Sequence, residues 1–252
     1  FWKVYKLTVS GFALNYATPV GLMGGEPYRI MELTPYVGAS KATSSVILYV
    51  MMHIFSHFCF WFFSIFLYLA LRPVDIAMGT ILAVVGAVSL LAIYFFMKGY
   101  KNGMAVRTLK LLQHIPFVKE WAKRFSENKR EALERVDSQI AELHKQRRST
   151  FYASLSLEFM ARIIGCLEVY FILNILTTDV SFPACILIMA FTSLFANLFF
   201  FSPMQLGARE GGFALAVGGL AIPGAFGVYT GLITRVRELI WIVIGVLLMK
   251  VG

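Results

Sequence analysis

Charged side chains stand beside prolines and glycines at two places in an otherwise apolar sequence. NYATPVGLMGGEPYRI holds Glu26 and Arg29, and SPMQLGAREGG near the other end of the chain holds Arg209 and Glu210. Ionisable side chains at membrane depth are costly, and they generally mark binding or transport sites. We therefore interpret these four residues as candidates for binding a charged or zwitterionic ligand. The alternative is that each pair only anchors a helix end.

Two more candidates lie in the second half of the chain. Glu168 stands 10 residues after Glu158, where an apolar span begins, which places it on the order of 15 Å deep at about 1.5 Å per residue. Such a carboxylate needs a partner, and we expect Arg29 or Arg209 opposite it. Its role is open between ligand or proton binding and a structural pair. Arg235 follows the second broken segment and adds positive charge to the same site.

Other polar residues are interpreted as structural. His53 and His57 are four residues apart, a spacing that can place two imidazoles on one metal ion. No third ligand stands near them in sequence, so polar contacts between helices are the favoured interpretation. We expect Arg162 either to snorkel or to pair with Glu158. GLMGGEP lacks the Lys-Ser/Thr ending of a P-loop, and no Ser/His/Asp constellation stands out, so we predict no catalytic residue, no metal and no cofactor.

The composition is that of an integral membrane protein. Of the 252 residues 58% are hydrophobic and 15% are charged, and the mean hydropathy is +0.72, whereas soluble domains are about 45–50% apolar. We attribute the net charge of +9 to membrane orientation and anionic lipid and not to nucleic acid. The three cysteines lie in apolar segments without C-x-x-C spacing, which predicts small buried side chains.

Helices must position the candidates, because a membrane span needs about 20 apolar residues. The apolar runs are 46–71, 76–97, 159–176, 184–201 and 238–251. We expect an all-α, polytopic integral membrane protein with a single domain over residues 1–252. Its parts are a first broken segment (1–45), two spans (46–97), a basic loop (98–150), two spans (151–201), and a second broken segment with the last span (202–252).

The loop 98–150 sets the predicted orientation. It holds 13 basic and 6 acidic residues, a net +7 of the chain's +9. By the positive-inside rule this loop is cytoplasmic and the connector 177–183 lies outside. Apolar residues at helical spacing from Leu133 to Leu143 predict an amphipathic helix in the loop, either a solvated elbow or a contact with anionic lipid.

Prolines and glycines predict that both charged segments are broken. Six of them between Pro19 and Pro35 exclude a continuous span, so two half-helices meeting at the glycines are expected. PVGLMGGE aligns with PMQLGARE, where each proline stands seven residues before its glutamate. Paired broken helices in two halves of a chain point to a binding site at the membrane midplane. We therefore expect two re-entrant segments in an inverted-repeat-like arrangement.

The same motifs resemble a known family. Asn15 and Pro19 followed by GGEPYR, and LGAREGGFAL followed by ITRVRELIW, are similar to the lysylphosphatidylglycerol synthase transmembrane, or flippase-like, family over essentially the whole chain. The resemblance implies a multi-pass protein of a bacterial or archaeal cytoplasmic membrane with a lipid-translocating fold, and it adds Asn15 to the substrate-binding candidates. Members usually carry more hydrophobic sequence before the first motif, so we expect an N-terminally truncated chain.

These observations together predict a lipid flippase-like protein that binds a phospholipid or glycolipid headgroup in an intramembrane polar cavity. No segment resembles the soluble synthase domain of the aminoacyl-transferring members, so the chain is predicted not to be an enzyme. Two alternatives stay open: the membrane portion of a phosphatidylglycerol lysyltransferase or similar lipid-modifying enzyme, and a scaffold that presents lipid to a partner. The expected partners are membrane lipid and either a synthase domain or a second copy of the chain, with no nucleic acid.

Overall fold

The computed structural model describes residues 1–17, 24–102, 131, 134, 138, 148–177, 179–199 and 205–250. The elements in these ranges are all helices: α1 (Trp2–Ala17), α2 (Gly25–Val37), α3 (Ala39–Leu71), α4 (Ile76–Asn102), α8 (Arg148–Leu176), α9 (Phe182–Leu198), α10 (Ala208–Gly218) and α11 (Gly224–Lys250). The prediction of an all-α protein is confirmed for this part of the chain. The predicted amphipathic helix of the basic loop lies outside the described residues, apart from three isolated positions.

Among the described helices, three are long and apolar enough to cross a membrane, namely α3, α4 and α8. They contain the predicted spans 46–71, 76–97 and 159–176. The predicted span 184–201 corresponds to α9, which is apolar but has only 17 residues. At about 1.5 Å per residue it reaches about 26 Å, slightly less than the roughly 30 Å of hydrocarbon.

The first broken segment consists of two short helices, as predicted. α1 ends at Ala17 and α2 begins at Gly25, while the residues between them, Pro19 included, lie outside the described ranges. α2 ends where Gly38 takes a positive φ of 82° and its N–H donates to the Thr34 carbonyl, a common way to terminate a helix. The re-entrant placement of these helices in a membrane stays a prediction.

The second broken segment differs from the prediction. α11 begins at Gly224, well before Glu238, so Arg235 lies inside a continuous helix and not ahead of the last span. Residues 219–223 separate α10 from α11, and α10 itself begins at Ala208, after the end of α9 at Leu198. Helical structure continues through the charged residues because their side chains find partners on neighbouring helices, which offsets the cost of burying them.

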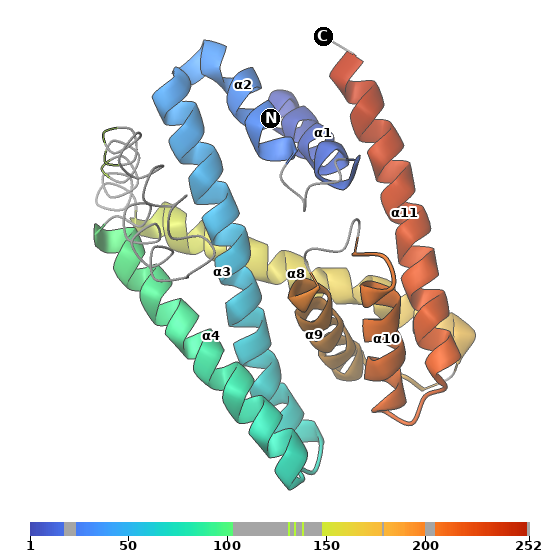
Figure 1. Cartoon of the computed structure of the whole chain (residues 1–252). Helices are drawn as coiled ribbons and strands as arrows, with labels where there is room; N and C mark the ends of the chain where they lie inside the picture. The colour runs from blue at the N-terminus through green and yellow to red at the C-terminus, as the bar shows by residue number, and fades with distance from the viewer. Residues whose placement is uncertain are drawn as a thin grey trace.

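α1 packs against both α2 and α11, and α10 packs against α11 (Figure 1). Glycines allow these close approaches. A Cβ on Gly245 of α11 would lie 2.6 Å from the Ala13 Cβ on α1, and a Cβ on Gly227 would lie 2.5 Å from the Phe213 carbonyl oxygen on α10. The packing therefore brings polar residues of α1, α10 and α11 to one side of the molecule.

α3 and α4 form an antiparallel pair, and α8 crosses α3 (Figure 1). A core of buried Met52, Phe55, Phe96 and Phe151 joins these three helices. Two further apolar cores hold Cys166 and Cys185 with no exposed surface, and all three cysteines are free thiols. The prediction of buried cysteines is confirmed for these two, while Cys59 is partly exposed.

Candidate functional site

The first group of candidate residues, which we call the Asn15 cluster, consists of Asn15, Glu26 and Arg29. The Asn15 side chain receives a hydrogen bond from the Gly25 N–H at 2.7 Å and donates one to Glu26 Oε1 at 3.0 Å. Glu26 Oε1 also pairs with Arg29 Nη1 at 3.2 Å. Glu26 and Arg29 thus form an ion pair, one of the two possibilities that their spacing left open, and Asn15 links this pair to the first turn of α2.

Arg29 is nearly enclosed, with 8% of its surface exposed. Its guanidinium lies across Gly11 on α1, where a Cβ would meet Nε at short range, and Nη2 donates to the Thr8 carbonyl at 3.4 Å. On the other side the guanidinium lies 4.9 Å from the centre of the Tyr49 ring on α3, within cation–π range. A positive charge is therefore held between three helices of the fold.

The second group, which we call the α11 cluster, consists of Glu168, Arg209, Glu210, Arg235, Arg237 and Glu238. Arg209 pairs with Glu238, and Glu210 pairs with Arg235 at 2.6 Å. Both pairs join α10 to α11, so the adjacent Arg209 and Glu210 each find a partner on the other helix. The structure thus brings together three of the predicted site residues, Arg209, Glu210 and Arg235, through two helices.

The sequence predicted Arg29 or Arg209 as the partner of Glu168, but its ion-pair partner is Arg237. Glu168 Oε1 pairs with Arg237 Nε at 3.0 Å, and Arg237 also lies 3.9 Å from Glu238 Oε1. The reason is the length of α11, which carries Arg237 past α8, whereas the sequence placed this residue before the last span. The cluster contains three carboxylates and three guanidinium groups, so its formal charges cancel.

Glu210 also caps α10, an 11-residue helix that is too short to span a membrane. Its Oε2 accepts a hydrogen bond from the Gly207 N–H at 2.9 Å. Burial raises the pKa of a carboxyl group, but hydrogen bonds from the backbone N–H groups and from Arg235 outweigh it, and the pKa of Glu210 lies below its usual range. The aligned Glu26 likewise lies in the first turn of a short helix, where a negative charge complements the helix dipole.

Two carboxylate oxygens in these clusters are buried and make no hydrogen bond within the described residues. They are Glu26 Oε2 and Glu238 Oε2, and only 3% of the Glu238 surface is exposed. Leaving a buried acceptor unsatisfied costs about 1–3 kcal/mol, and more for a charged group. Tyr16, the neighbour of Asn15 on α1, interacts with both Arg209 and Glu238, so α1 connects the two clusters.

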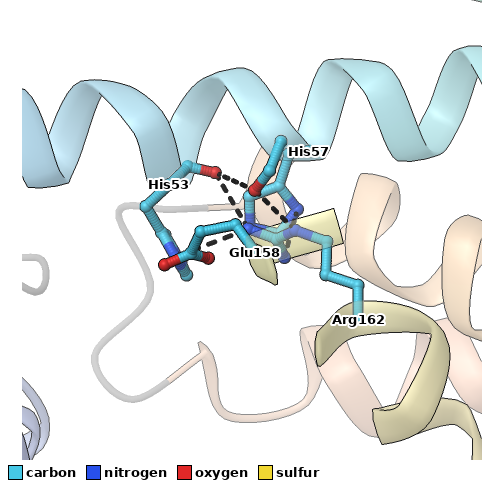
Figure 2. A network of polar contacts seen from close by, with 5 residues as sticks. His53, His57, Glu158 and Arg162 are labelled. Atoms are coloured by element: carbon cyan, nitrogen blue, oxygen red, sulfur yellow. Dashed lines mark hydrogen bonds and ion pairs between the residues drawn. The ribbon is translucent and has the colours of Figure 1, made fainter. Parts of the chain in front are cut away.

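A third polar group joins α3 to α8 and was only partly predicted (Figure 2). Arg162 donates to Ser56 Oγ at 2.8 Å and to the His53 carbonyl at 2.8 Å, and its Nη1 lies 3.2 Å from His57 Nδ1. Glu158 pairs with His53 at 3.3 Å and not with Arg162, contrary to one of the two expectations for that arginine. The two histidines make the polar contacts between helices that the sequence favoured. Among the described residues no group of three or more metal-ligating side chains forms.

A pocket of about 640 Å³ opens beside this network between α3 and α8. Its polar lining comes from Glu158 and the hydroxyl groups of Ser45, Tyr49, Thr150 and Ser154. Tyr49 separates the pocket from Arg29, because the same ring carries the guanidinium on its face. Sequence reasoning missed the pocket, since its walls come from two stretches, 45–52 and 150–161, that lie far apart in the sequence.

One of three comparisons with known proteins found a match. The profile of the family described as "Lysylphosphatidylglycerol synthase TM region" matches residues 1–245. No curated protein and no solved structure matched the chain. With its three long apolar helices, the chain is a multi-pass membrane protein. It belongs to the lysylphosphatidylglycerol synthase transmembrane-region family.

Proposed function

We propose that this chain binds the polar headgroup of a phospholipid or glycolipid among the charged residues of α1, α2, α10 and α11, and helps that headgroup cross the membrane. The α11 cluster is the observation that carries the proposal. Its six charges pair across three helices, two of which are joined by a turn at 219–223. Charges buried at membrane depth are expensive to maintain and serve binding or transport in most membrane proteins.

A headgroup would bind here by exchanging partners. Every carboxylate and guanidinium group of the α11 cluster already has an ion-pair partner. A phosphate that approaches Arg209 therefore competes with Glu238, and the displaced carboxylate would be left buried without a counter-charge. That arrangement is strongly unfavourable. A headgroup that carries hydrogen-bond donors or an ammonium group as well as a phosphate satisfies both partners at once.

An exchange of ion-pair partners would also allow the helices to move relative to one another. The ion pairs hold α10 to α11 and α8 to α11, so a ligand that takes over one side of a pair loosens the contact between those helices. The Asn15 cluster supplies a comparable set on α1 and α2, with Arg29 enclosed and Glu26 Oε2 unpaired within the described residues. Rocking of one set of short helices against the other is then the proposed route between leaflets.

The test is a lipid-scrambling assay with the purified chain in vesicles of phosphatidylcholine and phosphatidylglycerol. The vesicles contain a trace of fluorescent phosphatidylglycerol, and an impermeant reductant bleaches only the label in the outer leaflet. We expect the wild-type protein to move inner-leaflet label to the outer leaflet, so that the reductant bleaches it as well. Arg29→Gln and Arg209→Gln should slow this at least about tenfold, which equals about 1.4 kcal/mol. The matched control is Arg72→Gln, because Arg72 is exposed on the link between α3 and α4.

Folding of each variant is checked by its thermal unfolding midpoint, so that loss of transport is not loss of structure. Unchanged scrambling in folded Arg29→Gln and Arg209→Gln proteins would refute the assignment of these residues. Equal slowing in Arg72→Gln would show that general positive charge, and not the site, is responsible.

The family description favours a second candidate function. It names a synthase, and in this second function the same headgroup site presents lipid to a synthase domain, with transfer chemistry carried out outside this chain.

Binding without scrambling would support that function. It would appear as retention of fluorescent phosphatidylglycerol by wild type in detergent and weaker retention by Arg209→Gln.

We further propose that the loop 98–150 faces the cytoplasm of a bacterial or archaeal cell, because it holds +7 of the net charge. Single cysteines in this loop, in a chain lacking its native cysteines, would then react with an impermeant thiol reagent only after the membrane is opened. Labelling from outside intact cells would reverse the proposed orientation.

A further inference from the structure

The network between α3 and α8 fixes where the hydrogens of its two histidines lie. Arginine can only donate hydrogen bonds, because all its N–H groups are donors and it remains charged. Arg162 Nη1 lies 3.2 Å from His57 Nδ1. His57 Nδ1 must therefore be the acceptor, and the hydrogen of the neutral His57 ring is on Nε2.

His53 Nδ1 has two neighbours with opposite requirements (Figure 2). It lies 3.3 Å from Glu158 Oε2, which as a carboxylate only accepts, and 3.5 Å from Arg162 Nη2, which only donates. One nitrogen cannot satisfy both. A hydrogen on Nδ1 satisfies Glu158, whereas a bare Nδ1 would turn a lone pair toward the carboxylate.

Arg162 does not require His53 Nδ1 as a hydrogen-bond acceptor, so a hydrogen can lie on that nitrogen. Its guanidinium already donates to the His53 carbonyl and to Ser56 Oγ, both at 2.8 Å, and to His57 Nδ1. Arg162 can therefore lose the longer contact between its Nη2 and His53 Nδ1 and keep its other hydrogen bonds. Glu158 has no comparable substitute, since its side-chain hydrogen bond within the described residues is the one to His53.

We propose that His53 is a proton-binding site in which Glu158 holds one hydrogen on Nδ1 and leaves Nε2 to take up and release a proton. Within the described part of the chain no hydrogen bond or ion pair involves Nε2. The His53 side chain is 48% exposed, and Glu158 lines the pocket between α3 and α8. A carboxylate that fixes the tautomer of an imidazole and stabilises its charged form is a recurrent arrangement in proton-transfer sites.

The surrounding charges define the environment of this proton. Arg162 on α8 opposes a positive charge on the ring, and Glu158 favours it. Tyr49 stacks on the His53 ring from the same helix, and beyond Tyr49 lies Arg29 of α2. On α4 the described titratable groups near its end, Tyr94 and Lys98, contact each other; the described part of α9 contributes no acidic or basic side chain.

The test is nitrogen-15 NMR of the intact chain with labelled histidine in lipid nanodiscs. The signals of His53 are identified by their loss in His53→Gln. We expect the neutral His53 ring to carry its hydrogen on Nδ1, so that Nε2 is the nitrogen that gains a hydrogen when the ring is protonated. In Glu158→Leu only Arg162 faces Nδ1, so the hydrogen of the neutral ring should move to Nε2.

The matched control is Ser154→Ala, which removes another polar group from the same pocket wall on α8 and should leave both His53 signals unchanged. A wild-type neutral ring with its hydrogen on Nε2 overturns the proposal, because Nε2 would then not be the nitrogen that takes up the proton. The proposal is also overturned if the neutral His53 ring keeps its hydrogen on Nδ1 in the Glu158→Leu variant. If Glu158→Leu does not fold, the wild-type tautomer decides the question alone. None of these measurements requires lipid transport, so they stand apart from the proposed function.

Discussion

Replacing Arg209 by methionine tests whether α10 and α11 depend on their ion pairs. Arg209 pairs with Glu238, and their side chains are 23% and 4% exposed. Removing one partner of a buried pair costs about 3–5 kcal/mol, because the other charge is left without compensation. Arg237 lies 3.9 Å from Glu238 Oε1 and supplies part of that compensation. We therefore expect the lower end of the range, about 3 kcal/mol.

The assay is thermal unfolding of the purified protein in one detergent. A loss of about 3 kcal/mol in a chain of this size lowers the unfolding midpoint by roughly 6–12 °C. The decisive variant combines Arg209→Met with Glu238→Leu. Replacing a whole buried pair by apolar side chains of similar volume is often neutral, so the double variant should recover to within about 1 kcal/mol of wild type.

The matched control is Arg72→Met, the same substitution at an exposed arginine, which should change the midpoint little. The reasoning is refuted if Arg209→Met is as stable as wild type. It is also refuted if the losses of the two single variants simply add in the double variant, because a direct pair must show coupling.

Two further stability predictions concern close contacts. Gly25→Ala should lower the unfolding free energy by about 1–3 kcal/mol, because the added Cβ would collide with the Gly11 carbonyl. Gly165→Ala is the control, since a Cβ there meets nothing within 4 Å, and it should be neutral or stabilising. Equal shifts of the two thermal unfolding midpoints would contradict this prediction. Asn174→Ala should cost about 1–3 kcal/mol, because Asn174 bonds both the N–H and the carbonyl of Val180, and an unchanged midpoint would show that water replaces these bonds.

The elements of the fold were largely predictable because their signals are local. Twenty apolar residues make a span regardless of distant partners, and the clustered prolines and glycines around Gly24 prevent a continuous helix. The Glu26 and Arg29 pair was predictable for the same reason, because residues three apart on a helix are neighbours. Boundaries were less certain, and α11 began much earlier than its apolar stretch alone indicated.

The partners of the other charges were not predictable from local spacing. Glu168 and Arg237 are 69 positions apart, and His53 and Glu158 are 105 apart. Choosing Arg237 over Arg29 for Glu168 required knowing that α11 is continuous and packs against α8. The pocket beside Glu158 has the same origin, since two helices distant in sequence form it.

The ion pairs between α10 and α11 nevertheless follow a spacing rule that can be read from the sequence. Arg209 and Glu210 are adjacent on α10, whereas Arg235 and Glu238 are three residues apart and so lie on one face of α11. Two opposite charges on one helix then face two opposite charges on the other. Arg235 and Glu238 could have paired with each other within α11, but Arg209 and Glu210 would then have lacked ion-pair partners on α11. In the observed arrangement all four charged side chains have partners on the other helix, which is favoured because a buried charge without a partner costs more than a local ion pair contributes.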